Sequence, residues 1–241
     1  GSLTRMATLP HDPHTRLKRP LGGEKRVAWS APVPLDRVKA IARAHSATVN
    51  DVLVAALTGA LRGALAVHGE EVEQVRAMVP VNLRREKVDT RALGNQFGLI
   101  ILGLPVGVAE PVERVRETSR RMARLKASPE ALVAKELLRA MGWAPSLVED
   151  LGVRFFATKA SLVLTNVPGP RERLHLAGLP MKRLLFWVPQ SGRMGLGVSI
   201  FSYAGQVTVG VMSDAAVLPD PQALVKGIER ELDLAIGGGR S

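Results

Sequence analysis

The chain has 241 residues, enough for one large domain or two small ones, and its 46% hydrophobic and 23% charged residues are typical of a globular rather than a disordered protein. It contains no cysteine, which excludes disulfides, thiolate zinc sites and cysteine nucleophiles. The formal net charge of +11 is unusual and leaves three anionic partners to consider, namely nucleic acid, anionic lipid and a phosphate-rich small molecule.

The region 1–24 is basic, polar and rich in proline and glycine, which predicts a linker or arm that lies on a neighbouring surface. Its leading Gly-Ser resembles an expression scar, and no signal-peptide pattern follows it. No window reaches the ~18 apolar residues that a membrane-spanning helix needs. We therefore expect no transmembrane helix.

A single domain is predicted over 25–236, followed by a frayed tail at 237–241. Apolar periodicity predicts helices at 34–44, 49–67, 111–126, 129–141, 145–158 and 221–236. Short apolar runs predict strands at 25–32, 75–83, 97–106, 160–167, 184–188, 194–203 and 206–213, the last two joined by a tight turn at Ala204-Gly205. The order predicts a mixed α/β (α+β) fold, a central mixed β-sheet flanked by helices. The strands are too irregularly spaced for a doubly wound dinucleotide fold, and no Walker loop is present.

The helix at 49–67 is apolar almost all round and is predicted to lie in the core. Thr48 before it and Asp51 three residues later match a capping box, in which each residue bonds the other's backbone. On this interpretation Asn50 is a polar residue of the first helical turn. The capping box accounts for an aspartate at position 51 without any catalytic or binding role.

Two asparagines, Asn82 and Asn95, flank a charged loop between the strands at 75–83 and 97–106. Asparagine is a common turn residue, so loop geometry alone accounts for both. The alternative is a loop at the mouth of a substrate channel.

The helix at 111–126 is strongly basic on one side, and its apolar positions are expected to pack on the sheet. Nucleic acid is excluded as a partner because the cations are scattered and aromatic residues, 4% of the chain, are too few to stack bases. Three interpretations of the charge remain: an anionic lipid surface, a phosphate-rich small molecule and an ordinary solvated surface. The cations concerned are Arg114, Arg116, Arg120, Arg121, Arg124 and Lys126, and the apolar positions are Val112, Val115, Met122 and Leu125.

The strand at 160–167 ends in Thr165-Asn166-Val-Pro-Gly169-Pro, a rigid turn. The Asn166 amide and the Thr165 hydroxyl could each donate to a developing oxyanion or to a polar ligand. A turn stabilised by asparagine and proline is the competing interpretation. None of the five histidines has the partners of a catalytic or metal site, and no serine-hydrolase elbow is present.

Several motifs, taken in order, resemble the C-terminal domain of bacterial wax ester synthase/diacylglycerol acyltransferases. They are Thr48-Val-Asn-Asp51, Val79-Pro-Val-Asn-Leu-Arg84, Leu93-Gly-Asn-Gln-Phe-Gly98, Leu162–Pro170, Trp187-Val-Pro-Gln-Ser-Gly192 and Gly195–Tyr203. The resemblance covers 20–236 and implies a coenzyme A-dependent acyltransferase-like domain, one of two facing α/β domains with a tunnel between them. It implies transfer of a long-chain acyl group from acyl-CoA, a co-substrate rather than a bound cofactor, to a fatty alcohol or diacylglycerol.

The family carries its general base in a His-His-x-x-x-Asp-Gly motif, and nothing in this chain matches it. We therefore expect no catalytic residue here and a partner N-terminal domain that carries that motif. The alternative is a non-catalytic module that binds acyl-CoA or a lipid surface. The expected location is the cytoplasm, with contact to an anionic membrane or lipid-droplet surface. The resemblance and the motifs above assign substrate binding or active-site support to Asn50, Asp51, Asn82, Asn95, Thr165, Asn166, Gly169, Gln190 and Ser191.

Overall fold

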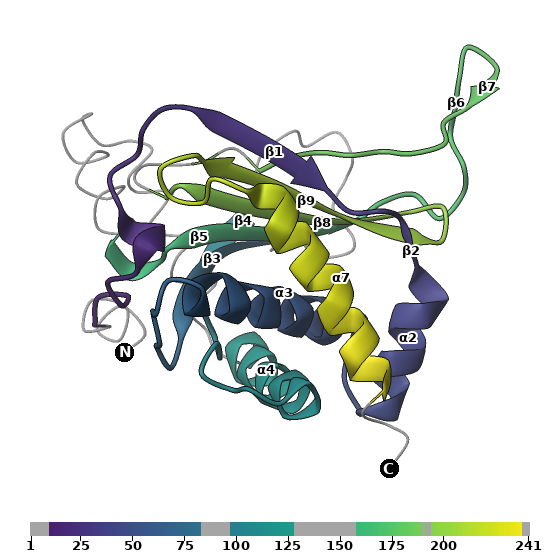
Figure 1. The fold of residues 1–241 in the computed structure, drawn as a ribbon. Helices are drawn as coiled ribbons and strands as arrows, with labels where there is room; N and C mark the ends of the chain where they lie inside the picture. Colours follow the sequence, from purple (N-terminus) through teal and green to yellow (C-terminus); the bar gives the residue numbers. More distant parts are fainter. Residues whose placement is uncertain (1–9, 83–96, 128–157, 189, 191–193, 238–241) are drawn as a thin grey trace.

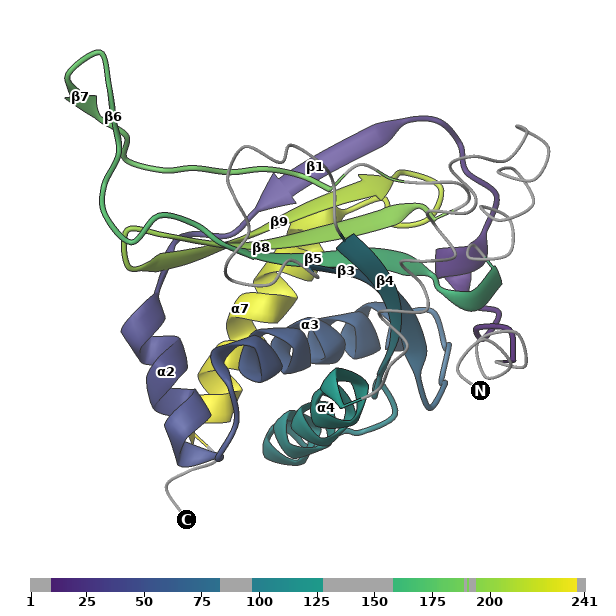
Figure 2. The same cartoon turned by 180° about the vertical axis from the view of Figure 1, so that it is seen from behind.

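The structure is a computed structural model, and it describes residues 10–82, 97–127, 158–188, 190 and 194–237. One twisted sheet lies over a layer of helices (Figures 1 and 2). The helices are α2 (Leu35–Ala44), α3 (Val49–Ala66), α4 (Pro111–Lys126) and α7 (Pro221–Gly237), and all four lie on the same face of the sheet. The apolar core fills the space between the two layers.

The sheet is mixed, as predicted. Its strands are β1 (Lys25–Trp29), β2 (Val33–Pro34), β3 (Val75–Asn82), β4 (Phe97–Leu104), β5 (Leu162–Pro168), β8 (Leu196–Tyr203) and β9 (Gln206–Asp214). The strand order is β1-β9-β8-β5-β3-β4, with β2 also paired to β9. The central pairs β3–β5 and β5–β8 are parallel, whereas β1–β9, β8–β9 and β3–β4 are antiparallel.

Helix α3 is the central helix, as its composition predicts. A run of residues from Asp51 to Leu61 is buried, and α4 and α7 pack beside it. By length and hydropathy α3 would also pass as a membrane span, which corrects our expectation that no window qualifies. Two-thirds of that window is buried inside the fold, as in the core helix of a globular domain.

The described part of the N-terminal region packs into the fold. Leu17 lies in the core, within the short 3₁₀ helix η1 (Arg16–Lys18). The buried Asp12 carboxylate accepts hydrogen bonds from the Arg76 backbone N–H and the Ser161 hydroxyl. Burial raises the pKa of the Asp12 carboxyl above its usual value, against the opposing effect of those hydrogen bonds.

The prediction of a strand at 184–188 is wrong. This segment packs across the sheet instead of pairing with it, and Gly197 and Gly210 let its backbone approach closely. A Cβ added to Gly197 would lie 2.9 Å from the Val188 carbonyl oxygen, and one added to Gly210 would lie 2.8 Å from the Phe186 carbonyl oxygen. A short hairpin that we did not predict precedes it, formed by β6 (His175–Leu176) and β7 (Leu179–Pro180). The predicted helices at 129–141 and 145–158 lie almost wholly outside the described residues.

Candidate functional site

Two predicted site residues from distant parts of the chain meet in the structure. The Asn166 side-chain Nδ2 donates a hydrogen bond of 2.6 Å to the Asn50 Oδ1. Asn50 stands in the first turn of α3, and Asn166 stands near the carboxyl end of β5. Asn50 is half-buried and Asn166 is exposed, so this contact lies at the surface, where a ligand can reach it.

Asp51 holds the start of α3 in the predicted capping box. Its Oδ2 accepts from the Thr48 backbone N–H at 2.9 Å, and the Asp51 N–H donates to the Thr48 hydroxyl at 3.2 Å. The same Oδ2 also accepts a 3.0 Å bond from the hydroxyl of Ser119 on α4. The carboxylate is buried, and its Oδ1 has no hydrogen-bond partner within the described part of the chain. Asp51 therefore orients the helix that carries Asn50 and joins it to α4.

Thr165 and Gly169 lie beside Asn166 at the same end of β5. Thr165 is buried and opposite Ser199 in the parallel pair β5–β8. The Gly169 N–H donates to the Ser202 carbonyl oxygen at 2.8 Å. A Cβ on Gly169 would lie 2.3 Å from that oxygen, so only glycine allows this turn to close against β8.

The backbone of Asn82 ends β3 at this same edge. Met78 pairs with Val163 in the parallel ladder, and four more residues along each strand bring the chain to Asn82 and Val167. The carboxyl ends of parallel strands lie at one edge of a sheet, which is where open α/β sheets bind ligands. Asn95 and Ser191 lie outside the described residues.

Gln190 is not part of this cluster. Its Nε2 donates to the carbonyl oxygens of Gly195 at 2.8 Å and Met212 at 3.3 Å, at the beginning of β8. Ile200, which is opposite Asn166, follows Gly195 by five residues, or about 16 Å of strand. The structure therefore gives Gln190 a role in tying the 184–190 segment to the sheet, away from Asn50 and Asn166.

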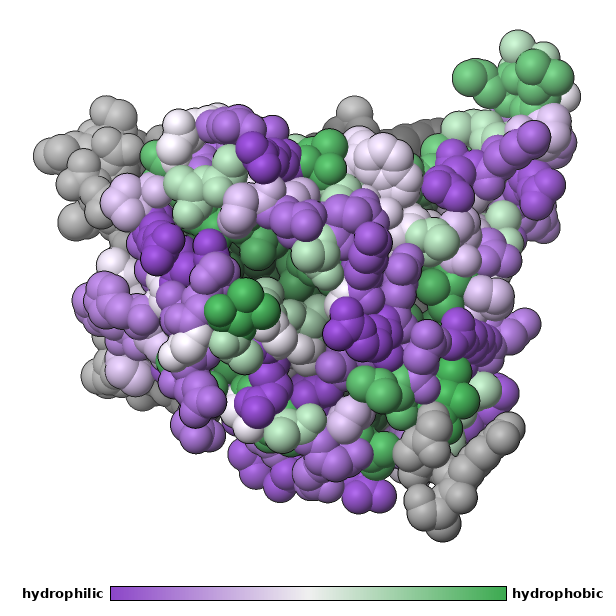
Figure 3. Space-filling model, in the orientation of Figure 1, coloured by the Kyte–Doolittle hydropathy of each residue, from purple (hydrophilic) through white to green (hydrophobic). Residues whose placement is uncertain are grey.

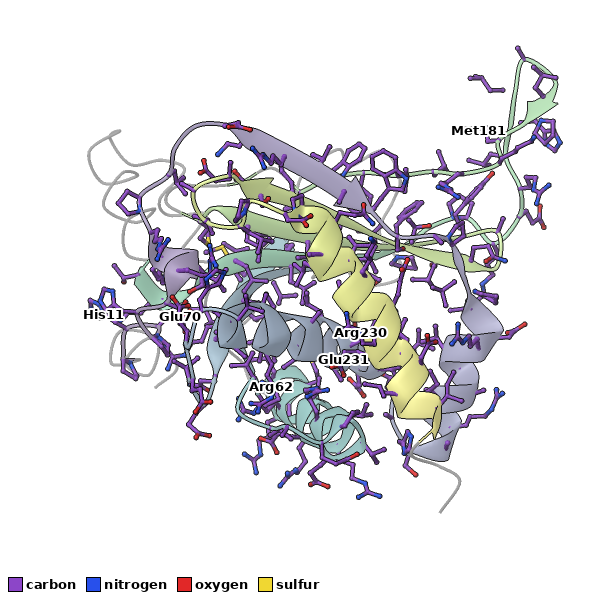
Figure 4. The ribbon with its side chains drawn as sticks, viewed as in Figure 1. His11, Arg62, Glu70, Met181, Arg230 and Glu231 are labelled. Atoms are coloured by element: carbon purple, nitrogen blue, oxygen red, sulfur yellow. The ribbon has the colours of Figure 1, made fainter. Side chains whose placement is uncertain are left out.

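The basic helix α4 is less cationic at the surface than its sequence predicts. Arg114 is buried and paired with Glu231 of α7, which corrects its assignment to an exposed basic face. Glu231 is labelled on α7 in Figure 4. Arg121 bonds Glu117 and the Gly103 carbonyl, and Arg120 is also paired with Glu117. The apolar positions do pack inward as predicted: Val112, Val115 and Met122 are buried and Leu125 is half-buried.

No group of three or more histidine and acidic residues that could hold a metal ion occurs among the described residues. His11, His14, His68 and His175 are exposed, and the half-buried His45 ends α2 with its Nε2 3.1 Å from the Ala235 carbonyl oxygen. Within the part of the chain that the structure describes, no histidine forms a hydrogen bond with Asn50 or Asn166.

Sequence reasoning missed Ser119 and Tyr203. Ser119 lies next to the buried stripe of α4 formed by Val112, Val115 and Met122, so a polar residue at that position could have indicated a buried partner. Tyr203 is the single tyrosine of the chain, and its hydroxyl bonds two backbone groups at the base of the β6–β7 hairpin. No local sequence pattern around Tyr203 predicts that its hydroxyl would hold this hairpin.

With this geometry in place, comparison with known proteins decides the family. Residues 93–235 match a family model described as the WS/DGAT C-terminal domain, a match that covers more than half of the 241 residues. The chain belongs to this family. The resemblance and the fold class expected from the motifs are thereby confirmed.

Individual relatives and a solved structure support the same family assignment. A probable diacylglycerol O-acyltransferase of Mycobacterium tuberculosis is 30% identical over 223 residues, which cover 88% of this chain and 47% of the relative. The structure of wax ester synthase/diacylglycerol acyltransferase from Marinobacter aquaeolei VT8 superposes with a TM-score of 0.72 at 25% identity, over 99% of this chain and 55% of that one. The chain spans about half the length of the curated relatives it matches.

The WS/DGAT domain shares its fold with more distant proteins. A nonribosomal peptide synthetase superposes with a TM-score of 0.64 at 20% identity, over 99% of this chain and 25% of that one. At this identity the likeness shows the fold alone.

Proposed function

We propose that this chain is the C-terminal half of an O-acyltransferase that moves a long-chain acyl group from acyl-CoA to a fatty alcohol or diacylglycerol. Membership of the WS/DGAT family supports the reaction class. The observation that carries the proposal is the hydrogen bond between Asn50 and Asn166, because it joins two motifs that are 116 residues apart in sequence. A turn role for Asn166 and a capping role for the first turn of α3 would not require that contact.

The chemistry follows from the reaction class. A base removes the acceptor's hydroxyl proton as its oxygen attacks the thioester carbonyl, and collapse of the tetrahedral oxyanion breaks the carbon–sulfur bond. The ester and the coenzyme A thiol are the products, and the thiol sulfur takes up the proton. The base belongs to an N-terminal domain with the His-His-x-x-x-Asp-Gly motif, since this chain holds no such motif.

The role of this chain is to supply donors and to position them. The contact uses one of the two Asn166 amide hydrogens, and the side-chain Oδ1 of Asn50 fixes the plane of that amide. Among the described residues the second amide hydrogen of this exposed side chain has no partner, so it can meet a carbonyl oxygen of the substrate. Thr48, Asp51 and Ser119 hold α3 in place and so position Asn50.

The same proposal puts the enzyme in the cytoplasm, in contact with the membrane or droplet that contains its lipid acceptor. The alternative, a non-catalytic module that binds acyl-CoA or a lipid surface through α4, loses support from the structure of that helix. Arg114 is buried, Arg116 is paired with Glu113, and Arg120 and Arg121 share the Glu117 carboxylate within the helix.

The test is an esterification assay with and without the N-terminal half. Release of coenzyme A can be followed with a thiol reagent, and this chain adds no background because it has no cysteine. We expect turnover of palmitoyl-CoA with hexadecanol or dipalmitoylglycerol only when both halves are present. A stable complex of both halves without turnover of either acceptor would overturn the proposal. Turnover by this chain alone would overturn our placement of the base.

A further inference from the structure

The β6–β7 hairpin projects from the body of the molecule with apolar side chains at its end (Figures 1 and 3). Leu176 is 70% exposed and Leu179 is 72% exposed, the largest exposed fractions among the leucines of the described residues. Leu174, at 42%, lies nearer the body. Such exposure has a free-energy cost in water unless another surface covers it.

The hairpin has one apolar face and one polar face. Leu176 is opposite Leu179 in the register, and Leu174 is opposite Met181, whose N–H bonds its carbonyl oxygen. Residues two apart on a strand and directly opposite on its partner point to the same side, so these four side chains form one face. The opposite face carries Arg173, His175, Pro180 and Lys182, all of them exposed. This alternation is typical of a hairpin with one side buried against a partner.

The base of the hairpin is held rigidly by Tyr203. Its hydroxyl accepts from the Leu174 N–H at 2.8 Å and donates to the Met181 carbonyl oxygen at 2.9 Å, so it bridges the two strands where they leave the body. Met181 is labelled at this point in Figure 4. The turn at Ala177-Gly178 has positive φ at both residues, the geometry of a tight type I′ turn. Isolated two-stranded hairpins are marginally stable in water, so packing against another surface would stabilise this one.

The hairpin also begins beside the candidate site. Gly169 and Pro170, directly after β5, bond the backbone of Ser202 and Ala204, and Tyr203 lies between those two. The chain then continues into β6. The edge that presents Asn166 and the root of the hairpin are thus one edge of the sheet.

We infer that the apolar face of this hairpin docks on the N-terminal half of the enzyme. This inference rests on the proposed function. The chain accounts for about half the length of its curated relatives, and a domain that brings a base to Asn166 has to lie over this same edge. A hairpin that extends past that edge meets such a domain directly. The leucines would then be buried at the interface, and the cationic face would remain in water.

The experiment measures association of this chain with the N-terminal half by isothermal titration calorimetry, without any turnover. The double variant Leu176→Asp/Leu179→Asp should raise Kd about 100-fold, equivalent to about 2.7 kcal/mol. His175→Asp is the matched control, because it adds a carboxylate to the opposite face, and it should change Kd less than threefold. Tyr203→Phe keeps the buried ring and removes the bridge, and we expect about a tenfold rise in Kd.

Three results would overturn the inference. The first is an unchanged Kd for the leucine variant, with circular dichroism and melting temperature like those of the unmodified chain. The second is loss of binding to phosphatidylserine or phosphatidylcholine vesicles with no loss of binding to the N-terminal half, which would make the hairpin a lipid anchor. The third is self-association of the chain that the leucine variant abolishes while Kd stays unchanged. Failure of the proposed function is distinguishable, since it would leave a leucine-dependent complex without acyl transfer.

Discussion

Replacement of Asn166 by alanine in the assembled enzyme separates a catalytic role from a structural one. Asn166 is exposed and its side chain makes one hydrogen bond within the described residues, so its loss should cost about 1 kcal/mol of unfolding free energy. If its amide also meets the oxyanion, its loss should raise the barrier by about 3–4 kcal/mol, a 10²–10³-fold fall in kcat. The kcat expected for Asn166→Ala therefore differs by at least two orders of magnitude between a catalytic and a purely structural role of Asn166.

The partner residue makes the test sharper. Asn50→Ala leaves the Asn166 amide in place and removes only the acceptor that orients it, so we expect a fall in kcat of about tenfold. In the double variant this additional loss should disappear, since a residue that acts through Asn166 has no effect without it. The measurements are kcat from thiol release and the melting temperature of each variant. An unchanged kcat for Asn166→Ala with a clearly lower melting temperature would refute the catalytic role and leave a turn residue.

Three further predictions concern activity and stability. The chain alone should show no measurable acyl transfer, since loss of a general base costs about 10²–10⁴-fold, and activity that persists after a further purification step would contradict this. Gly169→Ala should lower the unfolding free energy by about 2 kcal/mol through the clash with the Ser202 carbonyl oxygen, whereas Gly63→Ala, in an open position of α3, should leave it unchanged or raise it slightly in the same urea titration. Burial opposes ionisation of Asp214, but hydrogen bonds from Gly22, Lys25, Ala216 and Gly23 outweigh it and hold the pKa of this carboxyl well below the 3.8 of an unfolded chain. Its stabilisation is therefore complete above about pH 4 and is lost as the pH falls further, so Asp214→Asn should lower the melting temperature at pH 7 by more than at pH 3. Equal losses at both pH values would contradict this linkage.

The local elements of this protein could be predicted from its sequence because each depends on neighbouring residues. The capping box of Thr48 and Asp51 needs only a spacing of three, and the turn at Ala204-Gly205 is indicated by a glycine in a two-residue connection between two strand-like runs. The burial of α3 follows from its composition. The family resemblance likewise rests on short motifs in a fixed order.

The tertiary structure decided everything that depends on which elements become neighbours. Asn50 meets Asn166 because α3 packs beneath β5, and no periodicity within either segment reports that contact. Arg114 looks like part of a cationic surface until α7 brings Glu231 to it, and burial then turns a surface charge into an internal ion pair. The β6–β7 hairpin has paired strands of only two residues, shorter than the runs of about 4–8 residues that predict a strand, and its conformation depends on the Tyr203 hydroxyl. Sequence patterns report the preferences of single segments, whereas a site and an interface arise from packing between segments.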